Sequence, residues 1–98
     1  MSNISLNSRV VRSSDQVSTD LGGEAVILGL QSGEYFELKA VGARIWDEIG
    51  KPKTAGEIVD VLMKNYAVER GQCERDVLAL LESLADKWLI EVTDEPAQ

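Results

Sequence analysis

Residues 24–38, EAVILGLQSGEYFEL, decide the fold that we expect for this chain, because they predict two short strands joined by a glycine turn. A slip of one residue in a hairpin moves every side chain to the opposite face, so the register should be the one that gathers the apolar residues. A two-residue loop would place Leu28 opposite Glu37, which is a poor match. We therefore expect a three-residue loop, 31–33, with Gly33 at positive φ. This register predicts three pairs: Leu30 with Glu34, Leu28 with Phe36, and Val26 with Leu38.

A second hairpin is predicted just upstream, where residues 16–21 alternate between polar and apolar side chains and Gly22-Gly23 supplies a two-residue loop. This loop places Thr19 opposite Val26 and Val17 opposite Leu28. The two turns together predict a three-stranded meander with one apolar face, made of Val17, Thr19, Leu21, Val26, Leu28, Leu30, Phe36 and Leu38. The reverse face should carry Ala25, Ile27 and Tyr35.

In this meander the strand that begins near residue 24 is central, and the strand that ends at Leu38 lies at an edge. An edge strand exposes backbone groups that no neighbour pairs. We therefore expect this edge to be the working surface of the protein.

Beyond Ala40 the apolar period changes from two to about three and a half, which predicts three amphipathic helices. The first runs from Ala40 to about residue 49, and the second opens with a capping box in which Glu57 follows Thr54 by three residues. The third covers residues 72–87. Short extended segments are expected at 9–12 and 89–92. The predicted fold is α+β, with a three-stranded antiparallel sheet packed on three helices in a winged helix-turn-helix-like arrangement.

The chain has 98 residues, of which 44% are hydrophobic, and this is enough for one small domain. We expect a flexible N-terminus over residues 1–9, a single domain over residues 10–92 and a flexible acidic tail over residues 93–98. No apolar run approaches the ~18 residues of a membrane span, and residues 1–11 lack the pattern of a secretory signal. A single cysteine excludes an internal disulfide. A cytoplasmic location is the expectation.

The sequence contains no histidine, which excludes Ser-His-Asp and Cys-His nucleophiles and Cys/His zinc sites. No carboxylate cluster stands out from the general surface distribution, so we predict no catalytic residue, no metal and no cofactor. The net charge of −7 opposes nucleic acid as a partner, because nucleic-acid affinity depends on neutralising phosphates.

A few side chains could still act. Cys73 is in helical phase with Val77, which predicts a core position rather than a nucleophile. Trp46 and Trp88 are expected to be packing anchors, and Trp88 could alternatively line a groove. Arg75 and Asp76 could form a solvated ion pair or contact a ligand, and the sequence leaves both open.

Three stretches carry a resemblance: GEAVILGLQSGEYFELKAVGARIW, TAGEIVDVL and ERDVLALLESLADKWLIEV. Together they resemble the PqqD-like family, the small leader-peptide recognition domains of ribosomal peptide biosynthesis, from about Val10 to Val92. Among subgroups the chain is most similar to the free-standing domains of lasso-peptide clusters. Two positions depart from the family pattern, since many members have Asn at the position of Lys39 and Gly at the position of Trp88.

The resemblance implies a non-catalytic domain that binds the leader of a precursor peptide and passes it to a processing enzyme, most often a leader peptidase in lasso systems. The leader would add as a fourth antiparallel strand beside the edge strand and lie against the third helix. Carried over by position, the peptide-binding residues are Tyr35, Phe36, Glu37, Arg75, Asp76 and Ala79.

Three alternatives remain. One is a PqqD-type chaperone for a radical SAM enzyme, and another is a winged-helix DNA-binding regulator, which the acidic third helix disfavours. The last is a subunit that only scaffolds an enzyme complex.

Overall fold

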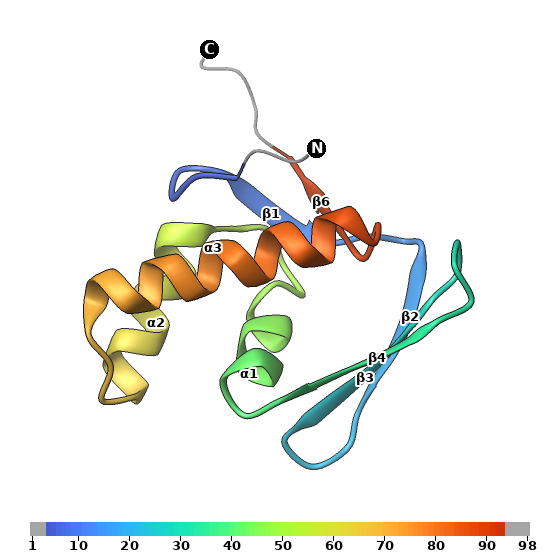
Figure 1. Ribbon diagram of the computed structural model, residues 1–98, viewed down its shortest axis with the longest axis horizontal. Helices are drawn as coiled ribbons and strands as arrows, with labels where there is room; N and C mark the ends of the chain where they lie inside the picture. Colours follow the sequence, from blue (N-terminus) through green and yellow to red (C-terminus); the bar gives the residue numbers. More distant parts are fainter. Residues whose placement is uncertain (1–3, 94–98) are drawn as a thin grey trace.

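The structure is a computed structural model that describes residues 4–93. In chain order its elements are β1 (Arg9–Arg12), β2 (Gln16–Asp20), β3 (Glu24–Gly29), β4 (Tyr35–Lys39), α1 (Val41–Glu48), β5 (Lys53–Thr54), α2 (Ala55–Asn65), α3 (Arg70–Asp86) and β6 (Ile90–Val92). The strands form two antiparallel three-stranded sheets, ordered β2-β3-β4 and β5-β1-β6. We call them the hairpin sheet and the small sheet. In Figure 1 the hairpin sheet projects to one side of the three helices.

The hairpin sheet has β3 at its centre and β4 at an edge, as the sequence predicted. The register of its first hairpin is also confirmed, because Thr19 lies opposite Val26 and Val17 lies opposite Leu28. Gly22 and Gly23 both adopt positive φ, at 65° and 92°, as a two-residue hairpin loop requires.

The predicted register of the second hairpin is wrong by one residue. Leu28 lies opposite Tyr35, not Phe36, and Phe36 lies opposite Ile27. The cause is the loop, which holds four residues, 30–33, rather than three. Its ends are fixed by two hydrogen bonds: the Gly29 N–H donates to the Glu34 carbonyl at 2.9 Å, and the Gly33 N–H donates to the Gly29 carbonyl at 2.8 Å. Gly33 does adopt the expected positive φ, at 73°.

Because of this slip, β4 packs with the predicted side chains inward, but β2 and β3 present the face opposite to the predicted one. Ala25 and Ile27, which we expected on the reverse face, are 5% and 0% exposed and belong to the core. Phe36 and Leu38 pack beside them, as partly buried members of the same cluster. Much of the predicted apolar face is instead open to solvent, with Val17 at 60%, Leu21 at 59% and Leu30 at 54% exposure. Tyr35 shares that outer face. Both faces carry apolar residues, so composition alone did not distinguish them.

The small sheet was not predicted. Its central strand β1 pairs with β5 through Val10 and Lys53, and with β6 through Val10 and Val92. The segment before β1 also contacts the helices, since Ile4 is 6% exposed and the Ala55 N–H donates to the Ser8 carbonyl at 3.0 Å. Residues 4–8 therefore pack on the start of α2. Residues 1–3 and 94–98 of the two predicted flexible ends lie outside the described residues.

The helices follow the sequence pattern closely. The capping box of α2 is confirmed: the Thr54 N–H donates to Glu57 Oε1 at 2.9 Å, and the Glu57 N–H donates to Thr54 Oγ1 at 3.1 Å. The third helix begins at Arg70, two residues before the predicted start, because the Glu69 carboxylate accepts the N–H groups of Gly71 and Gln72. These bonds lower the pKa of Glu69. No helix within residues 4–93 has the length and apolar character to cross a membrane.

The two tryptophans differ. Trp46 is 2% exposed and forms part of the core, as predicted. Trp88 is 58% exposed and follows α3 at a φ of 60°, a left-handed conformation in which glycine is common. The prediction that Trp88 anchors packing is therefore wrong.

Candidate functional site

The outward edge of β4 has no strand neighbour within the described residues. Hydrogen-bonded and non-hydrogen-bonded pairs alternate along an antiparallel ladder. Since Gly29 bonds to Glu34, the pair of Ile27 and Phe36 two residues further along is also hydrogen-bonded. The backbone groups of Tyr35 and Glu37, which alternate with these positions along β4, point away from β3. They are the exposed donors and acceptors of the edge.

Beside this edge lies an apolar strip that connects β4 to the helices. Phe36 is half-buried, and the Nζ of Lys87 at the end of α3 lies 5.8 Å from its ring centroid. Leu38 and Leu80 of α3 both lie beside Gly42: a Cβ at position 42 would lie 3.6 Å from Leu38 and 4.0 Å from Leu80. The inner row of β4 therefore faces α3 across the beginning of α1.

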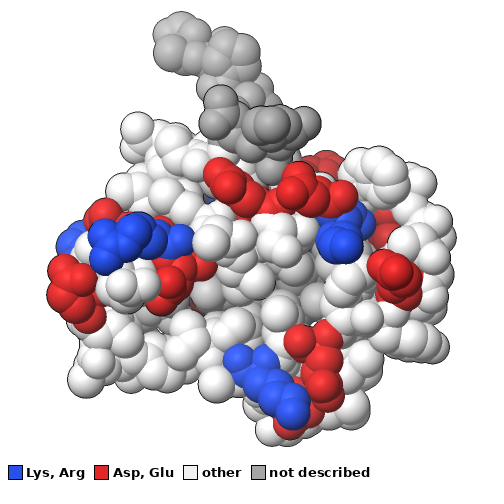
Figure 2. All heavy atoms as spheres, viewed as in Figure 1, with Lys and Arg blue, Asp and Glu red and all other residues white. Residues whose placement is uncertain are grey.

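The strip continues into a groove of about 290 Å³ between α1, α2 and α3. Asp76 is the only charged residue among its lining, which consists of Val41, Gly42, Ile45, Leu62, Tyr66, Val68, Gln72, Cys73, Asp76, Val77 and Leu80. Figure 2 shows the same distribution on this face, with charged side chains gathered towards the periphery and an uncharged, hollowed centre. A half-buried apolar groove beside an open strand edge is suited to an extended peptide with apolar side chains.

The side chains of the three predicted site residues on β4 point to different faces of the sheet. Phe36 points towards the helices and the groove side of the sheet. Tyr35, at 73% exposure, and Glu37 point to the opposite face, so only their backbone groups lie on the edge. The sequence predicted all three as peptide-binding residues, with Phe36 on the apolar face and Tyr35 on the reverse face, and the structure shows the same division between these two side chains.

Of the three predicted site residues on α3, only Asp76 lines the groove. Arg75 and Ala79 are exposed on the neighbouring surface of the helix. Arg75 donates not to Asp76 but to Gln72 Oε1 at 3.1 Å, and Gln72 Nε2 donates to Asp76 Oδ1 at 2.8 Å. The amide of Gln72 thus connects the two charged residues and holds the Asp76 carboxylate at the groove wall.

Several groove residues were missed as site residues, although their spacing carried a signal. Gln72, Asp76 and Leu80 are four residues apart on α3 and therefore lie in one row along its surface. Leu80 is only half-buried and lines the groove. Extending a row of helical neighbours from Asp76 would have found it.

Cys73 lies in the groove wall and is buried. Burial is the main cause that raises the pKa of its thiol, with the Asp76 carboxylate acting in the same direction. The nucleophilic form of cysteine is the thiolate. Cys73 therefore contributes an apolar wall rather than a reactive group, as its helical phase predicted.

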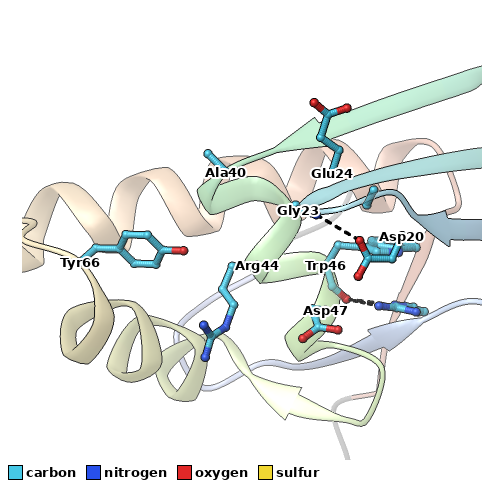
Figure 3. A pocket seen from close by; sticks show the side chains of 11 residues that line it. Asp20, Gly23, Glu24, Ala40, Arg44, Trp46, Asp47 and Tyr66 are labelled. Atoms are coloured by element: carbon cyan, nitrogen blue, oxygen red, sulfur yellow. Dashed lines mark hydrogen bonds between the residues drawn. The ribbon is translucent and has the colours of Figure 1, made fainter.

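A second hollow, of about 340 Å³, lies between the first hairpin and α1 (Figure 3). The Arg12 side chain is part of its lining, donating from Nε and Nη2 to the Trp46 carbonyl at 3.0 and 2.7 Å, with its guanidinium 4.8 Å from the Trp46 ring centroid. Burial lowers the pKa of Arg12, and the charge of Asp47 opposes this shift. Arg12 and Arg44 both line the hollow, so its cationic groups come from within the chain, and we assign it a structural role. Tyr66 lines both this hollow and the groove.

Metal chemistry has no support in the part of the chain that the structure describes. Within residues 4–93, no three His, Cys, Asp or Glu side chains lie where they could hold a metal ion together.

The comparisons with known proteins agree with this geometry. Residues 24–90 match the family model described as coenzyme PQQ synthesis protein D (PqqD), and the chain belongs to this family. No curated protein matches the sequence.

Two solved structures are similar over nearly their whole length. TbiB1 in complex with the TbiA(beta) leader peptide is 39% identical, covers 89% of this chain and 99% of its own, and superposes with a TM-score of 0.77. Lasso peptide synthetase B1 complexed with the leader peptide is 26% identical, covers 84% of this chain and 96% of its own, and gives a TM-score of 0.74. Both similar proteins were therefore solved with a leader peptide bound.

Proposed function

We propose that this chain is a non-catalytic recognition domain that binds the leader region of a ribosomally made precursor peptide by strand addition to β4. One observation carries the proposal: the open edge of β4 borders an apolar groove, on a fold shared with two leader-peptide complexes. The peptide-binding unit corresponds to residues 10–92, which includes all of the segment that matches the PqqD family model.

Two kinds of contact would share the work of binding. Outward backbone groups at Tyr35 and Glu37 pair with the peptide backbone with little demand on its sequence. Alternate peptide side chains then point towards α3, where the strip beside Phe36 and Leu80 accepts apolar groups and Asp76 accepts a donor. The exposed surface of Arg75 and Ala79 borders the same path. Strand pairing with two or three such anchors is consistent with dissociation constants from ~1 nM to a few μM.

The bound peptide would be presented to a processing enzyme. A lasso-peptide leader peptidase is the partner that the two structural matches favour. A PqqD-type chaperone of a radical SAM enzyme is the alternative that the family description favours. Because precursor peptides are made by ribosomes, the proposal places the domain in the cytoplasm.

We propose a winged helix-turn-helix-like arrangement for the helical half and the hairpin sheet, but the surface of α3 argues against a DNA-reading role. Arg70, one of its few basic residues, is already paired with Asp60 at 3.0 Å and with Glu74 at 3.1 Å. A helix that reads DNA needs free cations to neutralise phosphates.

The test uses two variants at one position. Proline at Glu37 removes an outward N–H and places a ring where the incoming strand must lie. We expect Glu37→Pro to weaken binding of a labelled leader peptide by at least the ~0.5–1.5 kcal/mol of one hydrogen bond, with a steric penalty added. Glu37→Ala keeps the N–H and removes a side chain that points away from the groove, so its affinity should stay close to that of the original protein.

Circular dichroism and urea unfolding should show that both variants are folded, because neither removes a bond to β3. A folded Glu37→Pro protein with unchanged leader affinity would show that the peptide does not add to β4. Failure of the unaltered protein to bind any leader below ~100 μM, about −5.5 kcal/mol, would argue against the function itself.

A further inference from the structure

The outer face of the hairpin sheet carries a continuous apolar surface that the peptide groove does not use. Val17, Leu28 and Tyr35 lie directly opposite one another on β2, β3 and β4. Val17 is 60% and Tyr35 is 73% exposed, and Leu30 extends the row at 54% exposure. The solvent face of an antiparallel sheet is normally polar, and a contiguous apolar patch of this kind is typical of an interaction surface.

The charges around this surface indicate what could cover it. Glu37 lies on the same face of β4, and Asp15 borders Leu30, whose N–H donates to the Asp15 carbonyl at 2.9 Å. Lys39 is the basic residue of this face, and it lies opposite Glu24. A second copy of this chain, which has a net charge of −7, would bring acidic rims together. A partner with an apolar centre and a rim of Lys and Arg is complementary.

The position of this surface beside the peptide-binding edge further restricts which kind of partner could bind there. A peptide strand added to β4 continues the sheet, and its side chains alternate between the groove and the outer face. The outer face would then run without a break from Val17 across Tyr35 and onto the bound peptide. A protein seated there would contact the domain and its peptide at once.

We infer that the outer face of β2, β3 and β4 is the docking surface for the enzyme that processes the bound peptide. That enzyme would contribute apolar side chains over Val17 and Leu28 and basic side chains towards Asp15 and Glu37. The inference rests on the proposed function, and it assigns the groove to the peptide and the opposite face of the same sheet to the enzyme.

The experiment compares two strand valines that are both open to solvent. Val17→Lys places a positive charge in the apolar row, at a position on an edge strand where lysine is well tolerated. Val92→Lys, at a residue 40% exposed on β6 of the small sheet, is the matched control. The probe is the purified leader peptidase encoded beside the precursor gene, titrated with each full-length protein with and without saturating leader peptide.

We expect Val17→Lys to weaken peptidase binding at least ~10-fold, as for a residue at the centre of an interface, and Val92→Lys to change it less than ~2-fold. Leader affinity should stay within ~2-fold for both variants, because neither position lies on the β4 edge or the groove. Peptidase binding should also weaken between ~50 and ~500 mM salt, as charges at the rim are screened. If Val17→Lys proves unfolded, Val17→Thr keeps the strand propensity and still removes apolar surface.

Equal peptidase affinity for the two lysine variants would overturn the inference. So would sedimentation data that show the original protein as a dimer and Val17→Lys as a monomer, because the face would then belong to a second copy. Absence of leader binding by the original protein is a separate result, because it would contradict the proposed function on which the inference rests.

Discussion

Both sheets of this domain have three strands, but their strands come from different arrangements along the chain. The hairpin sheet joins three strands that follow one another along the chain, whereas the small sheet joins residues 9–12, 53–54 and 90–92. In the small sheet the central Val10 is completely buried. In the hairpin sheet one face packs on the helices. The other face is open to solvent, and its residue Val17 is 60% exposed.

Long-range bonds hold the small sheet in place. The Arg12 N–H donates to the Ile49 carbonyl and the Ser13 N–H donates to the Leu89 carbonyl, both at 3.0 Å. The hairpin sheet depends instead on its own turns and on the packing of one face. The small sheet therefore connects three distant segments of the chain, whereas the hairpin sheet leaves one edge and one face available for partners.

Ile27 and Leu28, adjacent on β3, give the sharpest test of the two faces. Ile27 is 0% exposed on the inner face, so Ile27→Ala should reduce the free energy of unfolding by about 2–5 kcal/mol. Leu28 is half-buried on the outer face, and Leu28→Ala should cost about 1 kcal/mol or less. Urea unfolding of both variants measures this. Equal losses would mean that both faces are packed and that the outer face is not free.

The helices and the first hairpin could be predicted because their signals are local. The capping box at Thr54 and the loop Gly22-Gly23 each allow one geometry, and both were found as expected. The second loop allowed either three or four residues around Gly33, and both choices left apolar residues on each face. Packing against the helices determines that the face carrying Ile27 is the buried one, and the local sequence pattern contains no information on this packing.

The candidate site was predicted in part for the same reason. Strand order alone identifies β4 as an edge, so that prediction did not depend on the loop. The division between Phe36, which faces the helices, and Tyr35, which faces solvent, follows from alternation along β4 and was predicted, whereas the faces of Ile27 and Val17 require the correct register. The small sheet could not be predicted, because two- to four-residue strands from distant segments carry almost no pattern of their own.

Arg12 tests how strongly the small sheet is tied to the helices. Its guanidinium donates twice to the Trp46 carbonyl and covers the Trp46 ring, and methionine at this position keeps the apolar stem without the charge. We expect Arg12→Met to lower the free energy of unfolding by about 1.5–3 kcal/mol, the range for hydrogen bonds to charged groups. Leader affinity of the folded protein should be unchanged, because Arg12 lies outside the groove. A variant as stable as the original in urea would show that the small sheet does not need this link.

The smallest expected effect concerns Glu48, which joins α1 to the small sheet. Its carboxylate accepts from Arg44 Nε at 3.0 Å and lies 3.3 Å from Lys53 Nζ on β5. Burial acts to raise the pKa of Glu48, but the bonds from Arg44 and Lys53 outweigh it, and the pKa lies below its ordinary value of 4.5. A pKa that is lower in the folded state means that the charged carboxylate stabilises the fold above pH ~4.5. This contribution is lost as the pH falls through the folded pKa.

Glu48→Gln removes the titration while keeping the shape of the side chain. At pH 7 the original protein should be more stable than this variant by about 1 kcal/mol or less, since the ion pairs lie near the surface. As the pH falls below ~4.5 the difference in urea midpoint should shrink towards zero, and the other carboxylates cancel because both proteins share them. A difference that grew on acidification would mean that the Glu48 pKa is raised, and that burial rather than pairing dominates where α1 meets β5.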